Sequence, residues 1–84
     1  MRILIIEDNQ KLALSVQKGL EWKKFVVDLF FSGLVGEEKA YVNTYNTILL
    51  DLNLPDKDGL SILNFLRDSN IDNPIIIITT TGKL

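Results

Sequence analysis

The sequence predicts an α/β fold with a doubly wound parallel sheet, and three observations indicate it. Unbroken aliphatic runs of strand length recur at residues 3–6, 48–50 and 75–78. Such runs are typical of strands that helices cover on both faces of a parallel sheet. Segments with helical periodicity lie between the runs, and this alternation implies right-handed crossovers within one sheet. Polar residues follow where the runs stop, at the edge where ligands bind in such sheets.

A second strand, after the run at residues 3–6, is predicted over residues 25–31. Asp28 interrupts this otherwise apolar segment, which a strand nearer the edge of a sheet allows. The run at 75–78 consists of four isoleucines, and β-branched residues favour strands. Four strands are therefore expected, separated by three helices.

The first helix is predicted over residues 10–22. Apolar side chains recur there every four residues from Leu12 to Leu20, so that one face is apolar. Asp8 or Asn9 precedes the helix and is a suitable N-cap. The order of elements therefore begins with a strand, a helix and a second strand.

Two further helices are predicted between the later strands. Residues 33–43 form a short candidate whose helix propensity is lowered by Gly33 and Gly36. The other helix begins after Gly59 and ends near residues 69–70, with leucines and isoleucine on one face. The full order is then β-α-β-α-β-α-β.

Length and composition limit the number of domains and the kinds of partner that we expect. The chain has 84 residues, which allows one domain, here residues 1–84. The 9 basic residues are scattered and the net charge is −2, so we expect no nucleic-acid surface in this segment. The aliphatic runs are too short to span a bilayer, no signal-peptide pattern follows Met1, and there is no cysteine. We therefore expect a cytoplasmic protein that contacts no membrane.

Polar side chains gather at the predicted carboxyl edge of the sheet. Glu7 and Asp8 follow the first strand, Asp51 follows the third, and residues 79–81 are threonines after the fourth. If the first and third strands are neighbours, three carboxylates converge, and Mg²⁺ relieves the repulsion within such a hard oxygen site. A carboxylate facing Mg²⁺ can attack a phosphoryl group, so Asp51 is the candidate nucleophile and Thr79 the candidate hydroxyl near the transferred oxygens.

Simpler roles account for each of these residues taken alone. An acidic pair after a strand is commonly an exposed loop with a helix cap, and an aspartate at a strand end is commonly a turn residue. The threonines are ordinary β-formers. Their joint arrival at one edge of one sheet is what favours a functional site.

Three blocks of the sequence resemble the signature blocks of a known family. They are ILIIEDN at residues 3–9, ILLDLNLPDKDGL at 48–60 and PIIIIT at 74–79. In order and spacing they are similar to the receiver domain of bacterial response regulators, most of all to receivers attached to winged-helix DNA-binding domains. The resemblance covers essentially all of the chain. It implies a flavodoxin-like sheet, of which this chain is a (βα)3β portion without the fifth strand and the last helices.

The resemblance implies a role for each residue that matches the family's motifs. Asp51 matches the phosphoacceptor, Asp8 the direct metal ligand, and Glu7 the acidic neighbour that acts through a water. Asn53 would give its backbone carbonyl to the metal, which the family uses as Mg²⁺. Thr79 matches the hydroxyl that moves toward the phosphoryl group on activation.

The family also carries a lysine on its fifth strand, where it pairs with the phosphoryl oxygens. Lys57 and Lys83 are nearest in the sequence, and neither matches that position. We therefore expect weak or no phosphorylation of the 84-residue form. Because the run at 75–78 would lack an outer neighbour, we also expect a homodimer through the exposed sheet edge or through strand exchange.

The resemblance implies a signalling switch rather than an enzyme. The only reaction that such a domain catalyses is the transfer of a phosphoryl group to itself. A sensor histidine kinase would pass a phosphoryl group to Asp51 with Mg²⁺, and the acyl phosphate would switch an output domain that regulates transcription. DNA would be contacted only by that output domain. The alternative is a phosphorylation-deficient fragment that serves as a dimerising structural module.

Other classes of protein fit the residues less well. A phosphatase with an aspartate nucleophile needs a second aspartate where Asn53 stands. A flavodoxin-type binder needs a loop rich in glycine, serine or threonine after the first strand, where Glu7 and Asp8 would repel an anion. The ending at residues 81–83, TGK, lacks the first glycine of a P-loop, because an isoleucine stands in its place.

Overall fold

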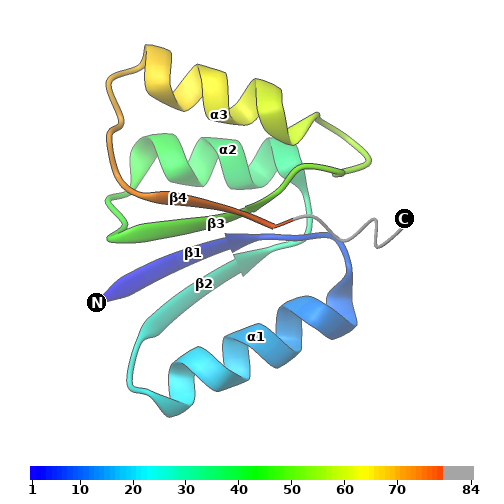
Figure 1. The fold of residues 1–84 in the computed structure, drawn as a ribbon, viewed down its shortest axis with the longest axis vertical. Coiled ribbons are helices and arrows are strands. Elements are labelled where there is room, and N and C mark those ends of the chain that lie inside the picture. Colours follow the sequence, from blue (N-terminus) through cyan, green and yellow to red (C-terminus); the bar gives the residue numbers. More distant parts are fainter. Residues whose placement is uncertain (79–84) are drawn as a thin grey trace.

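The computed structural model describes residues 1–78, which form a four-stranded parallel sheet with helices on both faces (Figure 1). In chain order the elements are β1 (Arg2–Ile6), α1 (Gln10–Trp22), β2 (Val26–Phe30), α2 (Gly33–Val42), β3 (Thr47–Asp51), α3 (Gly59–Asp68) and β4 (Ile75–Ile78). The strand order across the sheet is β2-β1-β3-β4, and each pairing is parallel. The predicted α/β fold with a doubly wound sheet is confirmed.

β2 lies at the edge of the sheet beside β1, where the charge of Asp28 is tolerated. Asp28 Oδ2 accepts a hydrogen bond of 2.7 Å from the Tyr45 hydroxyl and one of 2.8 Å from Arg2 Nη2. The strand that was predicted from the sequence to lie nearer an edge is therefore an edge strand within residues 1–78, and the charge of Asp28 has hydrogen-bond partners.

α2 forms despite its two glycines because those glycines allow close packing. A Cβ atom on Gly36 would lie 2.7 Å from Ile6 Cγ1, so α2 rests directly against β1. A Cβ atom on Gly33 would lie 3.1 Å from Asp56 Oδ1, where the loop after β3 meets the start of the helix. The favourable packing that this close approach allows outweighs the low helix propensity of glycine. The helix ends at Val42, one residue before the predicted end.

The two faces of the sheet bury separate cores. α1 covers one face, and α2 and α3 lie together on the other (Figure 1). Under α1 the buried residues are Ile3, Ile5 and Val27. Under α2 and α3 they are Leu4, Ile6, Ala40, Tyr45, Ile48, Leu50, Leu54, Ile62 and Leu66. The helices have 10 to 13 residues, and none in the described part of the chain is long and apolar enough to cross a membrane.

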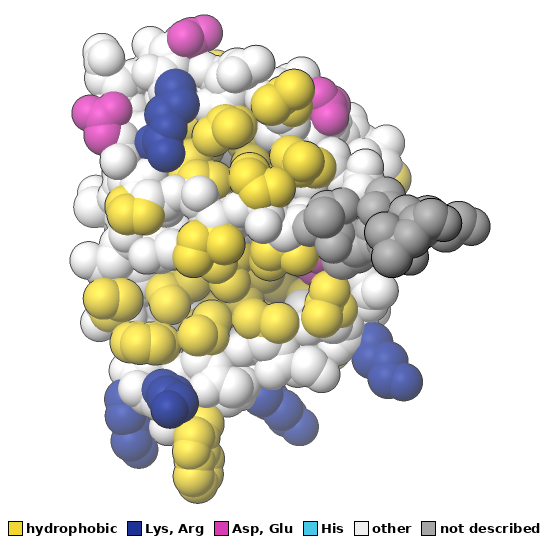
Figure 2. Space-filling view, viewed as in Figure 1, with side chains coloured by type: hydrophobic (Ala, Val, Ile, Leu, Met, Phe, Trp, Pro, Cys, Tyr) yellow, Lys and Arg dark blue, Asp and Glu magenta, His cyan; other side chains and the backbone are white. Residues whose placement is uncertain are grey.

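β4 is the strand with the least cover. Ile76 is 54% exposed and Ile77 40% exposed, and no residue of β4 is fully buried. Within residues 1–78 the backbone of β4 pairs only with β3. Figure 2 shows hydrophobic side chains gathered across the middle of this view, where Figure 1 has the strands between α1 and α3. The isoleucines predicted for a strand buried on both faces are thus partly open to solvent.

Candidate functional site

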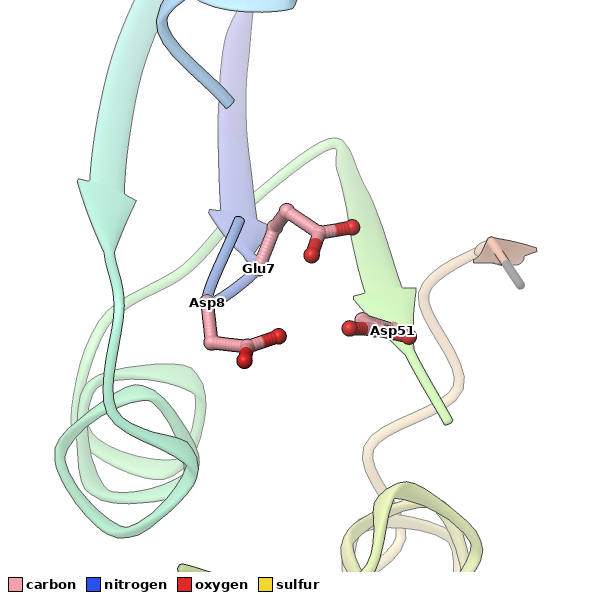
Figure 3. Close-up of side chains that lie close together, drawn as sticks. All are labelled: Glu7, Asp8 and Asp51. Atoms are coloured by element: carbon pink, nitrogen blue, oxygen red, sulfur yellow. The ribbon is translucent and has the colours of Figure 1, made fainter. Parts of the chain in front are cut away.

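The register of β1 and β3 brings three carboxylates together. Ile6 pairs with Leu50, so the residues that follow each of them, Glu7 and Asp51, lie side by side at the carboxyl edge of the sheet. Asp8 comes next in the β1–α1 loop. The three side chains point toward one another from the ends of the two strands (Figure 3), and their ligand oxygens lie within 4.8 Å of one another.

The cluster combines buried and exposed carboxylates. Glu7 is 1% exposed and Asp51 0% exposed, while Asp8 is open to solvent. One oxygen of each buried carboxylate accepts a hydrogen bond. Glu7 Oε2 accepts one from the Asn9 amide at 3.0 Å, and Asp51 Oδ1 accepts one from the Asn53 amide at 3.0 Å. The other two oxygens, Glu7 Oε1 and Asp51 Oδ2, have no hydrogen-bond donor among residues 1–78.

The environment of Glu7 opposes its ionisation. Burial is the main cause that raises the pKa of Glu7, and the nearby charges of Asp51 and Asp8 raise it further, to about 7. The amide hydrogen bond from Asn9 acts in the opposite direction. At neutral pH the site therefore holds carboxylates whose full ionisation costs free energy in the absence of a cation.

The donor set fits a hard divalent cation. Buried carboxylate oxygens without donors are costly, and a cation among them would supply the missing partner. The chain contains no histidine and no cysteine, so the local ligands are oxygens, which Mg²⁺ and Ca²⁺ prefer. The observation that supports this fit is the pair of buried oxygens on Glu7 and Asp51 that have no hydrogen-bond donor in the described part of the chain.

The loop after β3 is packed tightly against the candidate nucleophile. A Cβ atom on Gly59 would collide with the Asp51 carbonyl oxygen, and the Gly59 amide donates to the Leu52 carbonyl at 3.2 Å. Asn53 gives its amide to the Asp51 carboxylate, as described above. The backbone of the loop after β3 thus lies within contact of Asp51.

Asp56 is the residue of this region that sequence reasoning missed. The sequence motif that contains it assigned it no role, yet its carboxylate accepts hydrogen bonds from Ser32, Gly33 and Leu34 at the start of α2. An aspartate on a turn gives no sequence signal for partners more than 20 positions away. Only Ser32, a good N-cap residue, marks the helix start that Asp56 contacts.

Lys57 points to α2 and α3 rather than to the acidic cluster. Its Nζ lies 2.7 Å from Glu37 Oε2 and 5.9 Å from the centroid of the Phe65 ring. Lys57 therefore does not contact the acidic cluster, where the family's lysine would pair with phosphoryl oxygens. The predicted hydroxyl of Thr79 and the other lysine candidate, Lys83, lie outside the described residues.

The strand order and the acidic cluster where β1 and β3 end define a doubly wound domain with its site at the switch point of the sheet. The sequence model of the response regulator receiver domain matches residues 3–84. The chain belongs to this family of signalling domains.

Two longer relatives carry a similar segment. Response regulator ArlR of Staphylococcus saprophyticus is 49% identical over 78 residues, which cover 93% of this chain and 35% of that protein. Transcriptional regulatory protein CusR of Escherichia coli (strain K12) is 40% identical over 84 residues, or 100% of this chain and 37% of that protein. The chain therefore spans little more than a third of the length of these relatives.

Solved receiver structures share the fold. The Francisella response regulator 1452 receiver domain matches with a TM-score of 0.90 and 28% identity, over 98% of this chain and 68% of that one. A response regulator from Burkholderia pseudomallei, solved with a phosphorylated aspartic acid, a calcium ion and citrate, matches with a TM-score of 0.85 and 26% identity. That match covers 99% of this chain and 49% of the other.

Proposed function

We propose that this chain is the phosphoacceptor module of a two-component response regulator, with Asp51 as the acceptor and Mg²⁺ as the cofactor. The observation that carries the proposal is the buried Oδ2 of Asp51 beside Oε1 of Glu7, neither of which has a hydrogen-bond donor within residues 1–78. The phosphorylated aspartic acid and calcium ion of the Burkholderia relative add support. Family membership and this buried acidic site favour a phosphoacceptor over a purely structural module.

The cation would be held by Asp8 and Asp51 directly, by Glu7 through a water, and by the backbone carbonyl of Asn53. When bound, it would offset negative charge on the transferred phosphoryl oxygens. The domain would remain a signalling module whose only chemistry is transfer to itself.

The transfer would begin with attack by Asp51 Oδ2 on the phosphorus of a phosphohistidine in a sensor kinase. A new O–P bond would form as the N–P bond breaks, and the electron pair of that bond would return to the imidazole nitrogen. The product would be an acyl phosphate on Asp51. Thr79, just after β4, would direct its hydroxyl to the phosphoryl oxygens.

The regulated output would be transcriptional. CusR is named a transcriptional regulatory protein, and the chain aligns with only 37% of its length, so an output domain would occupy other parts of such a protein. The scattered basic residues of this segment give no nucleic-acid surface. DNA would thus be a partner of the output domain, and the sensor kinase a partner of this domain.

A magnesium titration of the 84-residue chain by calorimetry tests the cation site. We expect Asp8→Asn to weaken Mg²⁺ binding at least about tenfold, as loss of a ligating or ligand-orienting group does. The matched control is Asp72→Asn, which removes the same charge from an exposed position in the α3–β4 connection. Equal affinity of wild type and Asp8→Asn would sink the assignment.

Labelling with acetyl phosphate and Mg²⁺ tests the acceptor. In a receiver that continues through the fifth strand and its lysine, we expect mass spectrometry to place one phosphoryl group on Asp51 and none on the Asp51→Asn variant. In the 84-residue form we expect weak or no labelling at the same residue. Labelling of Asp51→Asn at the wild-type level would assign the acceptor elsewhere.

We further propose that the 84-residue form pairs with a second copy through β4. Ile76 and Ile77 are exposed on a strand that pairs only with β3 within the described residues, and such apolar edges recruit further strands. A two-fold symmetric pair would cover both edges at once. Sedimentation across a concentration range decides this, because a monomer at high micromolar concentration would contradict it.

A further inference from the structure

The loop between β3 and α3, residues 52–58, is tied to the start of α2 by one carboxylate. Asp56 Oδ1 accepts from the Gly33 amide at 2.8 Å, and Oδ2 accepts from the Leu34 amide at 3.1 Å and from the Ser32 hydroxyl at 2.6 Å. The first amides of a helix have no partner within the helix. Ser32 itself caps the Val35 amide, at 3.2 Å, so Asp56 supplies the cap for the two amides before it.

A second contact joins the same two segments. Lys57 Nζ donates to both carboxylate oxygens of Glu37 on α2, at 2.8 and 2.7 Å. There is no spare room between the segments, because a Cβ atom on Gly33 would lie 3.1 Å from both Asp56 Oδ1 and Leu54 Cδ1. The loop is therefore held on α2 at a defined position.

The other end of the loop is held at the acidic cluster. The Asn53 amide donates to Asp51 Oδ1, and Leu54 is buried in the core under α2 and α3. Burial of Leu54 keeps the loop near the sheet, whereas the charge-assisted hydrogen bonds of Asp56 fix its direction. A few residues thus connect the candidate acceptor to the N-terminus of α2.

We propose that Asp56 is a positioning residue for the Asp51 site, which keeps the Asn53 backbone beside Asp51 by anchoring the loop to α2. The inference rests on the cation site of the proposed function. Because coupling between two sites is reciprocal, cation binding at Asp51 also strengthens the Asp56 cap on α2.

Magnesium titrations of wild type, Asp56→Ala, Asp56→Asn and Asp58→Asn test the proposal. We expect Asp56→Ala to weaken Mg²⁺ binding about tenfold, the effect of losing a group that orients a ligand. Asp56→Asn keeps one acceptor oxygen, so its Mg²⁺ affinity should lie between those of the wild type and Asp56→Ala. Asp58→Asn is the matched control, because Asp58 is in the same loop with the same charge, but its side chain accepts a hydrogen bond from Ser61 of α3, at 3.4 Å, rather than from α2. It should change affinity no more than about twofold, as expected for an exposed, screened charge.

A readout without cation separates this inference from the proposed function. In the cation-free protein, Asp56→Ala should move the NMR amide signal of Asn53, and Asp58→Asn should not. In the wild type, Mg²⁺ should slow amide hydrogen exchange at Gly33 and Leu34.

If the wild type does not bind Mg²⁺, the proposed function fails. If it binds and Asp56→Ala binds equally well, or Asp56→Asn and Asp58→Asn weaken binding equally, the positioning role is overturned and the site stands. Circular dichroism confirms folding, and Ser32→Ala, which removes one partner of Asp56, replaces Asp56→Ala if that variant is unfolded.

Discussion

Asp28 lies in the middle of β2, but its carboxylate has two partners at the amino end of the sheet, where the Tyr45 hydroxyl, followed by Arg2, holds the pKa of that carboxyl below the usual 3.8. At the carboxyl end, burial and neighbouring carboxylates raise the pKa of Glu7 to about 7. The same sheet therefore stabilises one carboxylate in its charged form and opposes the charge of another. A carboxylate that has partners within the fold has a structural role, whereas a buried carboxylate with a raised pKa marks a candidate functional site.

The largest expected effect is a pH dependence that belongs to the carboxyl end alone. The folded-state pKa of Glu7 lies above its unfolded value of 4.5, so its contribution to stability is fully present below pH 4.5 and is lost as pH rises through about 7. At about 1.4 kcal/mol for each tenfold change in proton affinity, the loss is about 3 kcal/mol. Urea unfolding with chelator present, measured from pH 4.5 to 8, checks this.

Two variants make that experiment specific to one end of the sheet. Glu7→Gln cannot ionise and should flatten the profile across this range. Asp28→Asn should keep the wild-type slope, because Asp28 is ionised throughout the range and its carboxylate contacts Tyr45 and Arg2 rather than the acidic cluster. A wild-type profile that is already flat would contradict the assigned environment of Glu7.

The next effect in size is stabilisation by Mg²⁺. A ligand that binds only the folded state at about 100 times its Kd adds about 2.7 kcal/mol to the free energy of unfolding. We expect this gain for the wild type at pH 7 and a much smaller gain for Asp8→Asn, since the cation relieves repulsion that the free site carries. Thermal melts with and without the cation, and with Ca²⁺ as a second probe, measure it. A shift of the same size in both proteins would place the cation elsewhere.

The difference between the two ends also explains what could be predicted from sequence. Glu7, Asp8 and Asp51 were predicted to converge because each follows a strand and parallel strands end at one edge, so local position along the chain was sufficient. The partnership of Asp28 with Tyr45 was not predicted, because it joins residues 17 positions apart through side-chain geometry. Roles at the site remain expectations of the family resemblance.

Glycines illustrate the same limit within the fold. Gly33 and Gly36 were interpreted as weakening a helix, whereas Gly36 lets α2 lie against Ile6 of β1. Propensity is local, but close approach depends on the packing partner, which only the folded chain reveals. The position of the helix was predictable to within one residue, and the reason for its glycines was not.

A smaller effect is expected from Tyr45→Phe at the amino end. The substitution removes the hydroxyl donor to Asp28 and leaves the Arg2 contact, which lies at a partly exposed pair. We expect a loss of about 1 kcal/mol in the free energy of unfolding, the usual net value of one hydrogen bond. Mg²⁺ affinity should be unchanged, and a change in affinity would show that the two ends are coupled.

The smallest effect comes from Asp56, which tests whether partners or burial decide the pKa of a carboxylate. Asp56 is exposed, yet the Ser32 hydroxyl and then the Leu34 and Gly33 amides lower its pKa to about 2. Because the folded-state pKa is depressed, its contribution to stability is present above pH 3.8 and is lost as pH falls toward 2. A carbon-detected NMR titration should therefore give a midpoint for the Asp56 carboxyl far below that of an ordinary aspartate, and Ser32→Ala should raise it by removing the largest cause. A wild-type midpoint near 3.8 would mean that the hydrogen bonds to α2 do not persist in solution, and the anchoring of the loop would fall with them.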